Sequence, residues 1–194
     1  MSSRKKSRGG AVRSGRRPAP QPAGGDGHPA GRQGVTGLGR TPRDSAVEMR
    51  EIVLPSDANV LGAVLGGKVM HLMDLAAAMA AHRHARRPAV TAMVDELTFL
   101  HPIHIGEHMI LRASVNRAFT TSMEVGVKVF AENPWTGEGR HTSSAYFTFV
   151  TLGEDGRPAL VPAIVPETEE EQRRWREAGA RRERRLAHRG DAVR

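Results

Sequence analysis

Hydrophobic and polar residues alternate along much of the second half of the chain, with the period of two that is typical of β-strands. The clearest run spans 121–132, where one set of positions is apolar and the other is polar or small: Met123, Val125, Val127 and Val129 against Glu124, Gly126 and Lys128. Strand-like runs also occupy 46–54, 89–100, 108–119 and 140–152, and turn residues separate them. The pattern therefore predicts five strands.

A different period holds between 68 and 84, where apolar residues recur at helical spacing. Val69, Met73, Ala76 and Ala80 fall on one face, and the many alanines make this helix thin. A thin apolar helix is expected to lie buried under a sheet, without an open apolar face. The order of strand, helix and four antiparallel strands indicates an α+β fold, with one long sheet wrapped around one central helix. Because such a layer leaves a sheet edge uncovered, dimers are expected.

The basic charge of the chain is concentrated near its N-terminus. The whole sequence has a net charge of +8 and a pI of about 11.0, but residues 1–44 hold ten Lys or Arg residues against two acids, and the remainder is balanced. Residues 1–43 are rich in Gly, Pro, Ser and Arg, so we expect a disordered basic tail. We assign 44–166 to the folded domain and 167–194 to a charged C-terminal helix and tail, in which acids in the first turn and arginines near the end suit the helix dipole.

What the sequence lacks narrows the class of protein. It contains no cysteine, which rules out disulfides and a thiol nucleophile. No run reaches the ~18 apolar residues that span a membrane, and the N-terminus has no apolar signal region, so we expect a cytoplasmic protein. His101, His104 and His108 are spaced like metal ligands, but they fall on a Pro-containing strand end without supporting groups, and no metal is predicted.

The candidate chemistry lies where the loop PSDANVLGAVLGG enters the helix. Gly66 and Gly67 would leave backbone N–H groups unpaired at a helix N-terminus, where the dipole favours negative charge. Asn59 in the loop offers an amide, and Asp74 is the one carboxylate in the helix. A polar group that positions water, donors for an oxyanion and a base are what hydrolysis of an acyl group requires.

An ordered set of motifs then carries a family resemblance over residues 44 to 188. The set comprises Pro55-x-x-Ala58-Asn59-x-x-Gly62-x-x-x-Gly66-Gly67, Leu72-Met73-Asp74, Ala81-x-Arg83-His84, Thr91-Ala92-x-Val94-Asp95, Phe99-x-x-Pro102-Ile103-x-x-Gly106, Thr121-Ser122-Met123-Glu124-Val125 and Val161-Pro162-x-x-Val165-Pro166-Glu167-Thr168. In this order the motifs resemble the acyl-CoA thioester hydrolases of the hotdog fold.

The resemblance implies roles for individual residues. Asn59 and Asp74 would be catalytic, each supplied to one site by a different subunit, and Gly66 and Gly67 would let the thioester approach the helix amides. Coenzyme A, as part of substrate and product rather than as a cofactor, would contact a larger set: Ala92, Met93, Val94, Thr121, Ser122, Met123, Arg181 and Arg182. Members of the family form dimers that assemble further into tetramers or trimers of dimers. No membrane partner is implied.

Several alternatives remain open from the residues alone. Asp74 fits either a general base or a nucleophile that forms an acyl anhydride, and it also fits a half-exposed structural carboxylate. Asn59 can be a plain turn residue, and the C-terminal helix can be simply solvated. Other functions of the whole chain are a hydratase or dehydratase of the same fold, a non-catalytic acyl-CoA-binding protein, and a nucleic-acid module acting through the tail, which the neutral folded part disfavours.

Overall fold

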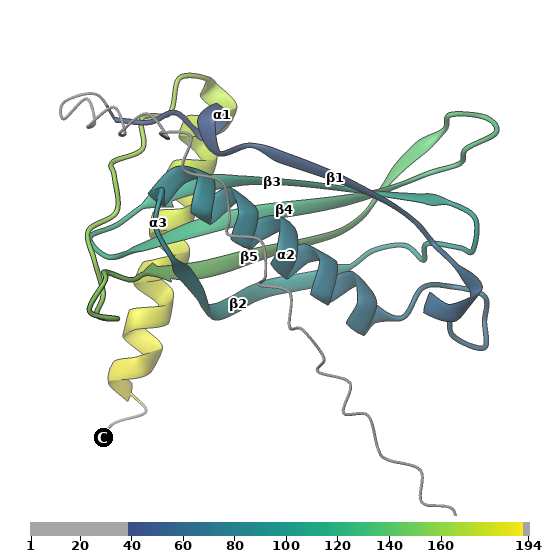
Figure 1. Ribbon diagram of the computed structural model, residues 1–194, viewed down its shortest axis with the longest axis horizontal. Coiled ribbons are helices and arrows are strands. Elements are labelled where there is room, and N and C mark those ends of the chain that lie inside the picture. The colour runs from purple at the N-terminus through teal and green to yellow at the C-terminus, as the bar shows by residue number, and fades with distance from the viewer. Residues whose placement is uncertain (1–38, 192–194) are drawn as a thin grey trace, which may run out of the picture. The chain divides into compact units, whose positions relative to one another are not determined.

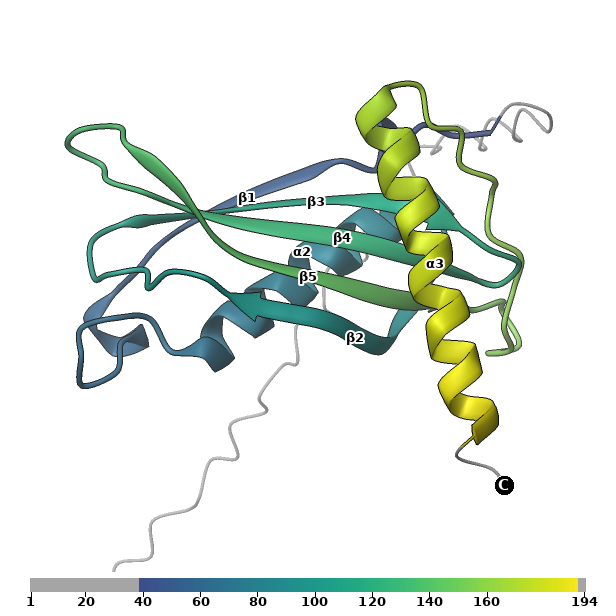
Figure 2. The ribbon, with the colours of Figure 1, turned by 180° about the vertical axis from the view of Figure 1, so that it is seen from behind.

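Five strands form one antiparallel sheet in the order β1-β3-β4-β5-β2. The computed structural model describes residues 39–191, with side chains through residue 187. The strands are β1 (Val47–Ile52), β2 (Ala89–Phe99), β3 (His108–Ala118), β4 (Ser122–Glu132) and β5 (Gly139–Thr151), and the helices are α1 (Pro42–Ser45), the short 3-10 turn η1 (Pro55–Asp57), α2 (Gly66–Ala85) and α3 (Glu169–Asp191). Helix α2 lies against one face of the sheet (Figure 1), and α3 crosses the other (Figure 2). This arrangement confirms the predicted hotdog layout of one long antiparallel sheet around one central helix.

The alanines of α2 set how closely the helix approaches the sheet. Ala76, Ala77, Ala80 and Ala81 are completely buried, together with Met73. Because a methyl group projects little from the helix, the inward-facing valines of β4 and phenylalanines of β5 form one closely packed core with these alanines. These inward positions follow the predicted period of two, and Met123, Val125, Val127 and Val129 are all buried in the core.

Apolar side chains on more than one side of α2 nevertheless remain exposed, which corrects the expectation that the helix has no open apolar face. Met70, Leu75 and Met79 are 43%, 41% and 40% exposed, and Val90 and Val94 on the neighbouring edge strand β2 are 47% and 46% exposed. The reason is that the sheet ends at β2, so nothing in the described chain covers the helix beyond it. Within residues 39–191, no helix is long and apolar enough to cross a membrane.

The outer face of the sheet is covered by α3, although its sequence is highly charged. Glu124, on the polar side of β4, is completely buried beneath this helix. Its carboxylate accepts hydrogen bonds from Nη2 of Arg181 at 2.6 Å and from Nε of Arg181 at 3.1 Å. Asn116 donates to the same carboxylate at 3.1 Å, and the Arg181 guanidinium lies 3.5 Å from the centre of the Tyr146 ring. The buried charges are therefore paired, as burial requires.

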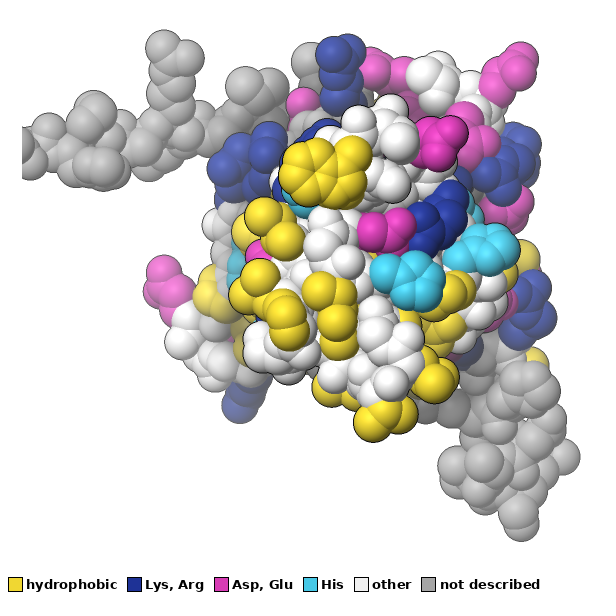
Figure 3. Space-filling model, turned by 90° about the vertical axis from the view of Figure 1, so that its right-hand side faces the viewer, with side chains coloured by type: hydrophobic (Ala, Val, Ile, Leu, Met, Phe, Trp, Pro, Cys, Tyr) yellow, Lys and Arg dark blue, Asp and Glu magenta, His cyan; other side chains and the backbone are white. Residues whose placement is uncertain are grey.

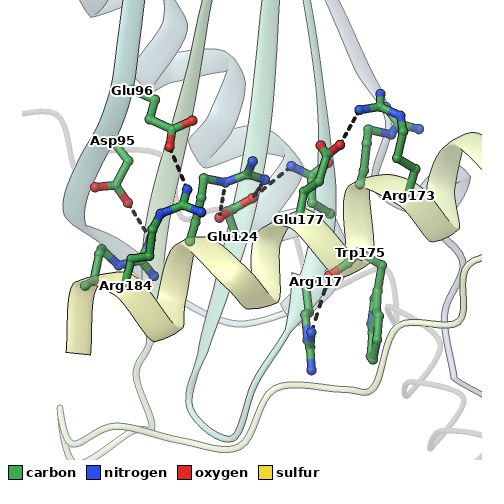
Figure 4. Close-up of polar contacts among 12 residues, drawn as sticks. Asp95, Glu96, Arg117, Glu124, Arg173, Trp175, Glu177 and Arg184 are labelled. Atoms are coloured by element: carbon green, nitrogen blue, oxygen red, sulfur yellow. Dashed lines mark hydrogen bonds and ion pairs between the residues drawn. The ribbon is translucent and has the colours of Figure 1, made fainter. Parts of the chain in front are cut away.

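Further arginines attach α3 along its length (Figure 4). Arg184 contacts Glu96 at 3.0 Å, and Arg185 pairs with Asp95, so that the end of the helix is joined to strand β2. Near the start of the helix, the guanidinium of Arg117 stacks 3.6 Å from the centre of the Trp175 ring. The C-terminal helix is thus a packed third layer and not a solvated extension.

The folded part also begins earlier than the predicted boundary at residue 44. The backbone N–H of Arg40 donates to the carbonyl of Ala163, and its side chain donates to the carbonyl of His84 at the end of α2. Thr41 precedes α1, where its backbone N–H donates to Asp44. Residues 40–43 therefore belong to the folded unit and not to the expected tail. Residues 1–38 lie outside the described part of the chain.

We predict that the buried ion pair Arg181–Glu124 contributes far more to stability than the exposed ion pair Arg184–Glu96 on the same helix. Arg181→Met should lower the free energy of unfolding by about 3–5 kcal/mol, because it leaves the Glu124 charge buried without a partner. The matched change Arg184→Met removes an exposed pair with Glu96 and should cost at most about 1 kcal/mol. Urea denaturation of the two variants checks this, and equal small losses would contradict it.

Candidate active site

The loop before α2 fixes Asn59 by its own backbone. The N–H of Asn59 donates to the carbonyl of Ala63 at 2.8 Å, and its carbonyl accepts from Gly62, which adopts φ +72°. The side-chain oxygen Oδ1 accepts from the N–H of Leu61 at 2.9 Å and of Ala63 at 3.3 Å. Among residues 39–191 the side-chain Nδ2 has no acceptor. Asn59 therefore uses its oxygen to shape the loop and keeps a free N–H₂ donor.

Two more free donors follow at the start of α2. Leu65 caps the helix, and its carbonyl accepts from the N–H groups of Lys68 and Val69. The N–H groups of Gly66 and Gly67 come before the first helical hydrogen bond and have no acceptor in the described chain. A methyl group placed on Gly67 would meet nothing within 4 Å, so a ligand can reach this backbone closely. Together with Asn59, these amides form a set of donors suited to a developing negative charge.

Asp74 lies two turns further along the same helix and is half-buried. Its Oδ1 accepts a hydrogen bond from Thr91 Oγ1 at 2.7 Å. That bond fixes one carboxylate oxygen and leaves the other to accept a proton. Sequence reasoning placed Thr91 within a motif but gave it no role. The hydroxyl at the start of β2 was visible in the sequence, but its contact with the helix depends on how the sheet packs.

The donors and the carboxylate do not meet within one chain. Gly66 and Asp74 are eight residues apart on α2, which corresponds to about 12 Å along the helix axis at 1.5 Å per residue. Reacting groups need to lie within about 3–3.5 Å of the same substrate atoms. The chain by itself therefore does not bring the predicted catalytic residues together.

The residues predicted to contact coenzyme A fall into two groups. Ala92, Met93 and Val94 lie on the edge strand β2, close to Thr91. Ser122 lies with Arg182 on the outer face of the sheet, where Nη1 of Arg182 donates to Oγ of Ser122 at 3.1 Å. Thr121 is half-buried in the turn before β4, and its carbonyl accepts from the N–H of Thr151.

Two members of this set are corrected by the structure. The Met123 side chain is completely buried between α2 and the sheet, because it occupies an inward position of β4. Arg181 is 5% exposed and holds Glu124 under α3, so its guanidinium is not part of a solvent-facing basic patch. Sequence spacing could not distinguish the buried Arg181 from its neighbour Arg182, since both lie in one run of arginines. No group of three or more His, Asp or Glu residues in 39–191 is arranged to hold a metal ion.

Comparison with known proteins agrees with the fold and the motifs. The thioesterase superfamily matches residues 61–137. The Bacillus subtilis protein named "uncharacterized acyl-CoA thioester hydrolase YkhA" is 42% identical over 129 residues, which cover 66% of this chain and 75% of that protein. The chain therefore belongs to the thioesterase superfamily, and within it to the acyl-CoA thioester hydrolases.

Solved structures show the same likeness over most of the chain. An acyl-CoA hydrolase from Staphylococcus aureus, solved in complex with butyryl coenzyme A, coenzyme A and coenzyme A disulfide, is 33% identical with a TM-score of 0.75, over 79% of this chain and 94% of that one. A hexameric acyl-CoA thioesterase is 38% identical with a TM-score of 0.74, over 76% of this chain and 95% of that one.

Proposed function

We propose that the protein hydrolyses acyl-CoA thioesters to a free carboxylic acid and coenzyme A. The observation that carries the proposal is the pairing of a free donor set, made of Asn59 and the amides of Gly66 and Gly67, with a carboxylate oriented by Thr91. The first group is suited to a tetrahedral oxyanion and the second to activation of water. Water is the only co-reactant that the balance of the reaction requires, so no cofactor is proposed.

In the proposed reaction the free oxygen of Asp74 removes a proton from water while the water oxygen bonds to the thioester carbon. The carbonyl oxygen becomes an oxyanion that the Gly66, Gly67 and Asn59 donors stabilise. Collapse of this intermediate breaks the C–S bond, and the proton held by Asp74 passes to the leaving thiolate. An acyl anhydride on Asp74 is the competing route. A single turnover in ¹⁸O-labelled water that gives unlabelled acid and ¹⁸O in Asp74 shows an anhydride that water opens at the Asp74 carbon, since attack of water on the thioester always labels the acid.

We propose that two copies of the chain complete each site. The ~12 Å between donors and carboxylate in one chain is resolved if α2 of a second copy runs antiparallel, with its N-terminus beside Asp74. Gly66, Met70 and Asp74 recur every four residues and so form one stripe of the helix. A two-fold axis near Met70 would place each Asp74 opposite the partner's donors. The exposed Met70 on this stripe, with Val90 and Val94 on the uncovered edge strand β2, supplies the apolar surface for this contact.

Comparisons with solved structures support roles for Asn59, Asp74 and Thr91, and they support assembly beyond a dimer. Variants of the Staphylococcus aureus hydrolase have been solved in which an asparagine, an aspartate and a threonine are each replaced by alanine. Those three positions have the same spacing along their chain as Asn59, Asp74 and Thr91 have here. The hexameric neighbour supports a trimer of dimers as the assembly. We propose that Ala92, Met93 and Val94, with Thr121, Ser122 and Arg182, contact the body of coenzyme A.

Thr91 is expected to position the carboxylate. Thr91→Val keeps the shape of the side chain but removes the hydrogen bond to Asp74, and kcat should fall by about 10- to 100-fold, the worth of one hydrogen bond to a charged group. Thr98 on the same strand donates only to the carbonyl of Glu96, at 3.3 Å, so Thr98→Val should leave kcat unchanged. Steady-state thiol release from acyl-CoA measures both, and equal effects would remove Thr91 from the site.

Mixed dimers test the shared site and the function together. Asp74→Asn and Asn59→Asp should each lower thiol release at least a hundredfold, although Asn59→Asp keeps the acceptor for Leu61 and Ala63. Co-refolding the two variants should restore about a quarter of parental activity, because half of the dimers then contain one intact site. Failure to recover activity while each variant remains dimeric would show that both groups act within one chain.

The register of the dimer is testable because the protein has no cysteine. Met70→Cys should form a disulfide-linked dimer on mild oxidation, since residues on a two-fold axis face their own copies and Cα atoms within ~7 Å can be bridged. Met79 is similarly exposed but lies about 13 Å from that axis along the helix, so Met79→Cys should stay unlinked. Non-reducing electrophoresis compares the two, and linkage through residue 79 alone would exclude the proposed register.

A further inference from the structure

A pocket opens beside the donor end of the site, on the end of the folded unit where hydrophobic side chains gather (Figure 3). Its volume is about 360 Å³, and it is lined by Asn59 and Gly66 together with side chains from the loop before α2 and from the segment after β2. The pocket therefore shares two residues with the proposed oxyanion site and continues away from them. Asp74 does not line it.

The interior of this pocket is mainly aliphatic, and the buried Ser143 adds one hydroxyl to its lining. Ala63, Val64, Val69 and Ile103 form its floor and are at most 9% exposed. No Lys, Arg, Asp or Glu residue of the described chain lines it. A carboxylate on the buried floor would lose its hydration without gaining a Lys or Arg partner, which is strongly unfavourable. The floor thus accepts apolar groups and rejects ionised ones.

The rim is exposed and largely apolar, with His101 as its polar member. Leu61 is 82% exposed, and Phe99 and Leu100 are about half exposed. The Phe99 ring adjoins the helix N-terminus, since a methyl group added at Gly66 would come 3.5 Å from its Cζ atom. Exposed apolar side chains around a concave apolar floor gain most when an apolar ligand covers them.

We infer that this pocket receives the acyl chain, and that the substrates are neutral, unbranched acyl-CoA esters of medium chain length. The inference rests on the proposed function, which places the thioester carbonyl at Asn59 and Gly66, so that the chain attached to that carbon enters the adjoining pocket. A methylene group takes roughly the volume of a water molecule, about 30 Å³ in the liquid, so the pocket holds on the order of ten carbons. Longer chains would extend beyond its floor.

A series of acyl-CoA substrates from two to eighteen carbons tests the inferred chain-length preference of the parental protein. Each methylene that enters the pocket should raise kcat/KM about fourfold, the equivalent of ~0.8 kcal/mol, until the curve levels off near eight to ten carbons. An acyl-CoA of similar length that ends in a carboxylate should be hydrolysed at least a hundredfold more slowly. A flat profile, or equal use of the ionised chain, would overturn the inference.

Two variants with a matched control locate the chain. Leu61→Asp should lower kcat/KM for octanoyl-CoA at least tenfold more than it lowers kcat/KM for acetyl-CoA. Val60 is adjacent, fully exposed and absent from the pocket lining, so Val60→Asp should change neither. Ala63→Leu fills the floor and should move the optimum toward shorter chains. Equal losses at every chain length, or an unchanged profile in both pocket variants, would show that the acyl chain lies elsewhere.

Measurements of binding test the acyl pocket independently of the proposed hydrolysis. By calorimetry with the Asp74→Asn protein, octanoyl-CoA should bind at least tenfold more tightly than coenzyme A, and adding Leu61→Asp should abolish the difference. If the parent hydrolyses no acyl-CoA but this difference is found, the proposed function fails and the pocket stands. If hydrolysis occurs and the difference is absent, the pocket inference fails and the function stands.

Discussion

The rigid length of α2 is the constraint on which the rest of this structure depends. A helix fixes the separation of its residues at about 1.5 Å each, so the amides at its start cannot approach a carboxylate two turns away. The same helix is thin enough for the sheet to wrap closely around it, and Met70 on the helix stays exposed, as do Val90 and Val94 on the unpaired edge strand β2. In the proposed site, a second copy of the chain supplies the group that this rigid helix keeps out of reach.

The two faces of the sheet differ in what covers them within the chain. The outer face is closed within the chain by α3, where the Glu124–Arg181 pair, the Asn116 amide and the Tyr146 ring satisfy charges that would otherwise be costly to bury. The inner face keeps an apolar margin along α2 and β2. The proposed association uses the side that carries Asp74 and Thr91, while α3 packs on the opposite face of the sheet.

The donor end of the site shows how one residue can serve both structure and chemistry. The Asn59 oxygen shapes the loop by accepting two backbone N–H groups, and the nitrogen of the same amide stays free. The loop therefore positions its own functional group without further support. It also forms one wall of the apolar pocket, so that the proposed oxyanion donors and the proposed acyl pocket are fixed by the same short segment.

The sequence by itself determined the number, type and approximate limits of the strands and of α2, because hydrophobic period and turn residues are local properties. It also identified Asn59, Gly66, Gly67 and Asp74 as candidates, because their motif is short and ordered. The contact of Thr91 with Asp74, the burial of Met123 and Arg181, and the start of the folded part near Arg40 were decided only by tertiary structure. Each depends on which residues distant in the chain come to share a surface. An arginine looks the same in sequence whether it faces water or a buried glutamate, and only the packing of α3 on the sheet distinguishes Arg181 from Arg182.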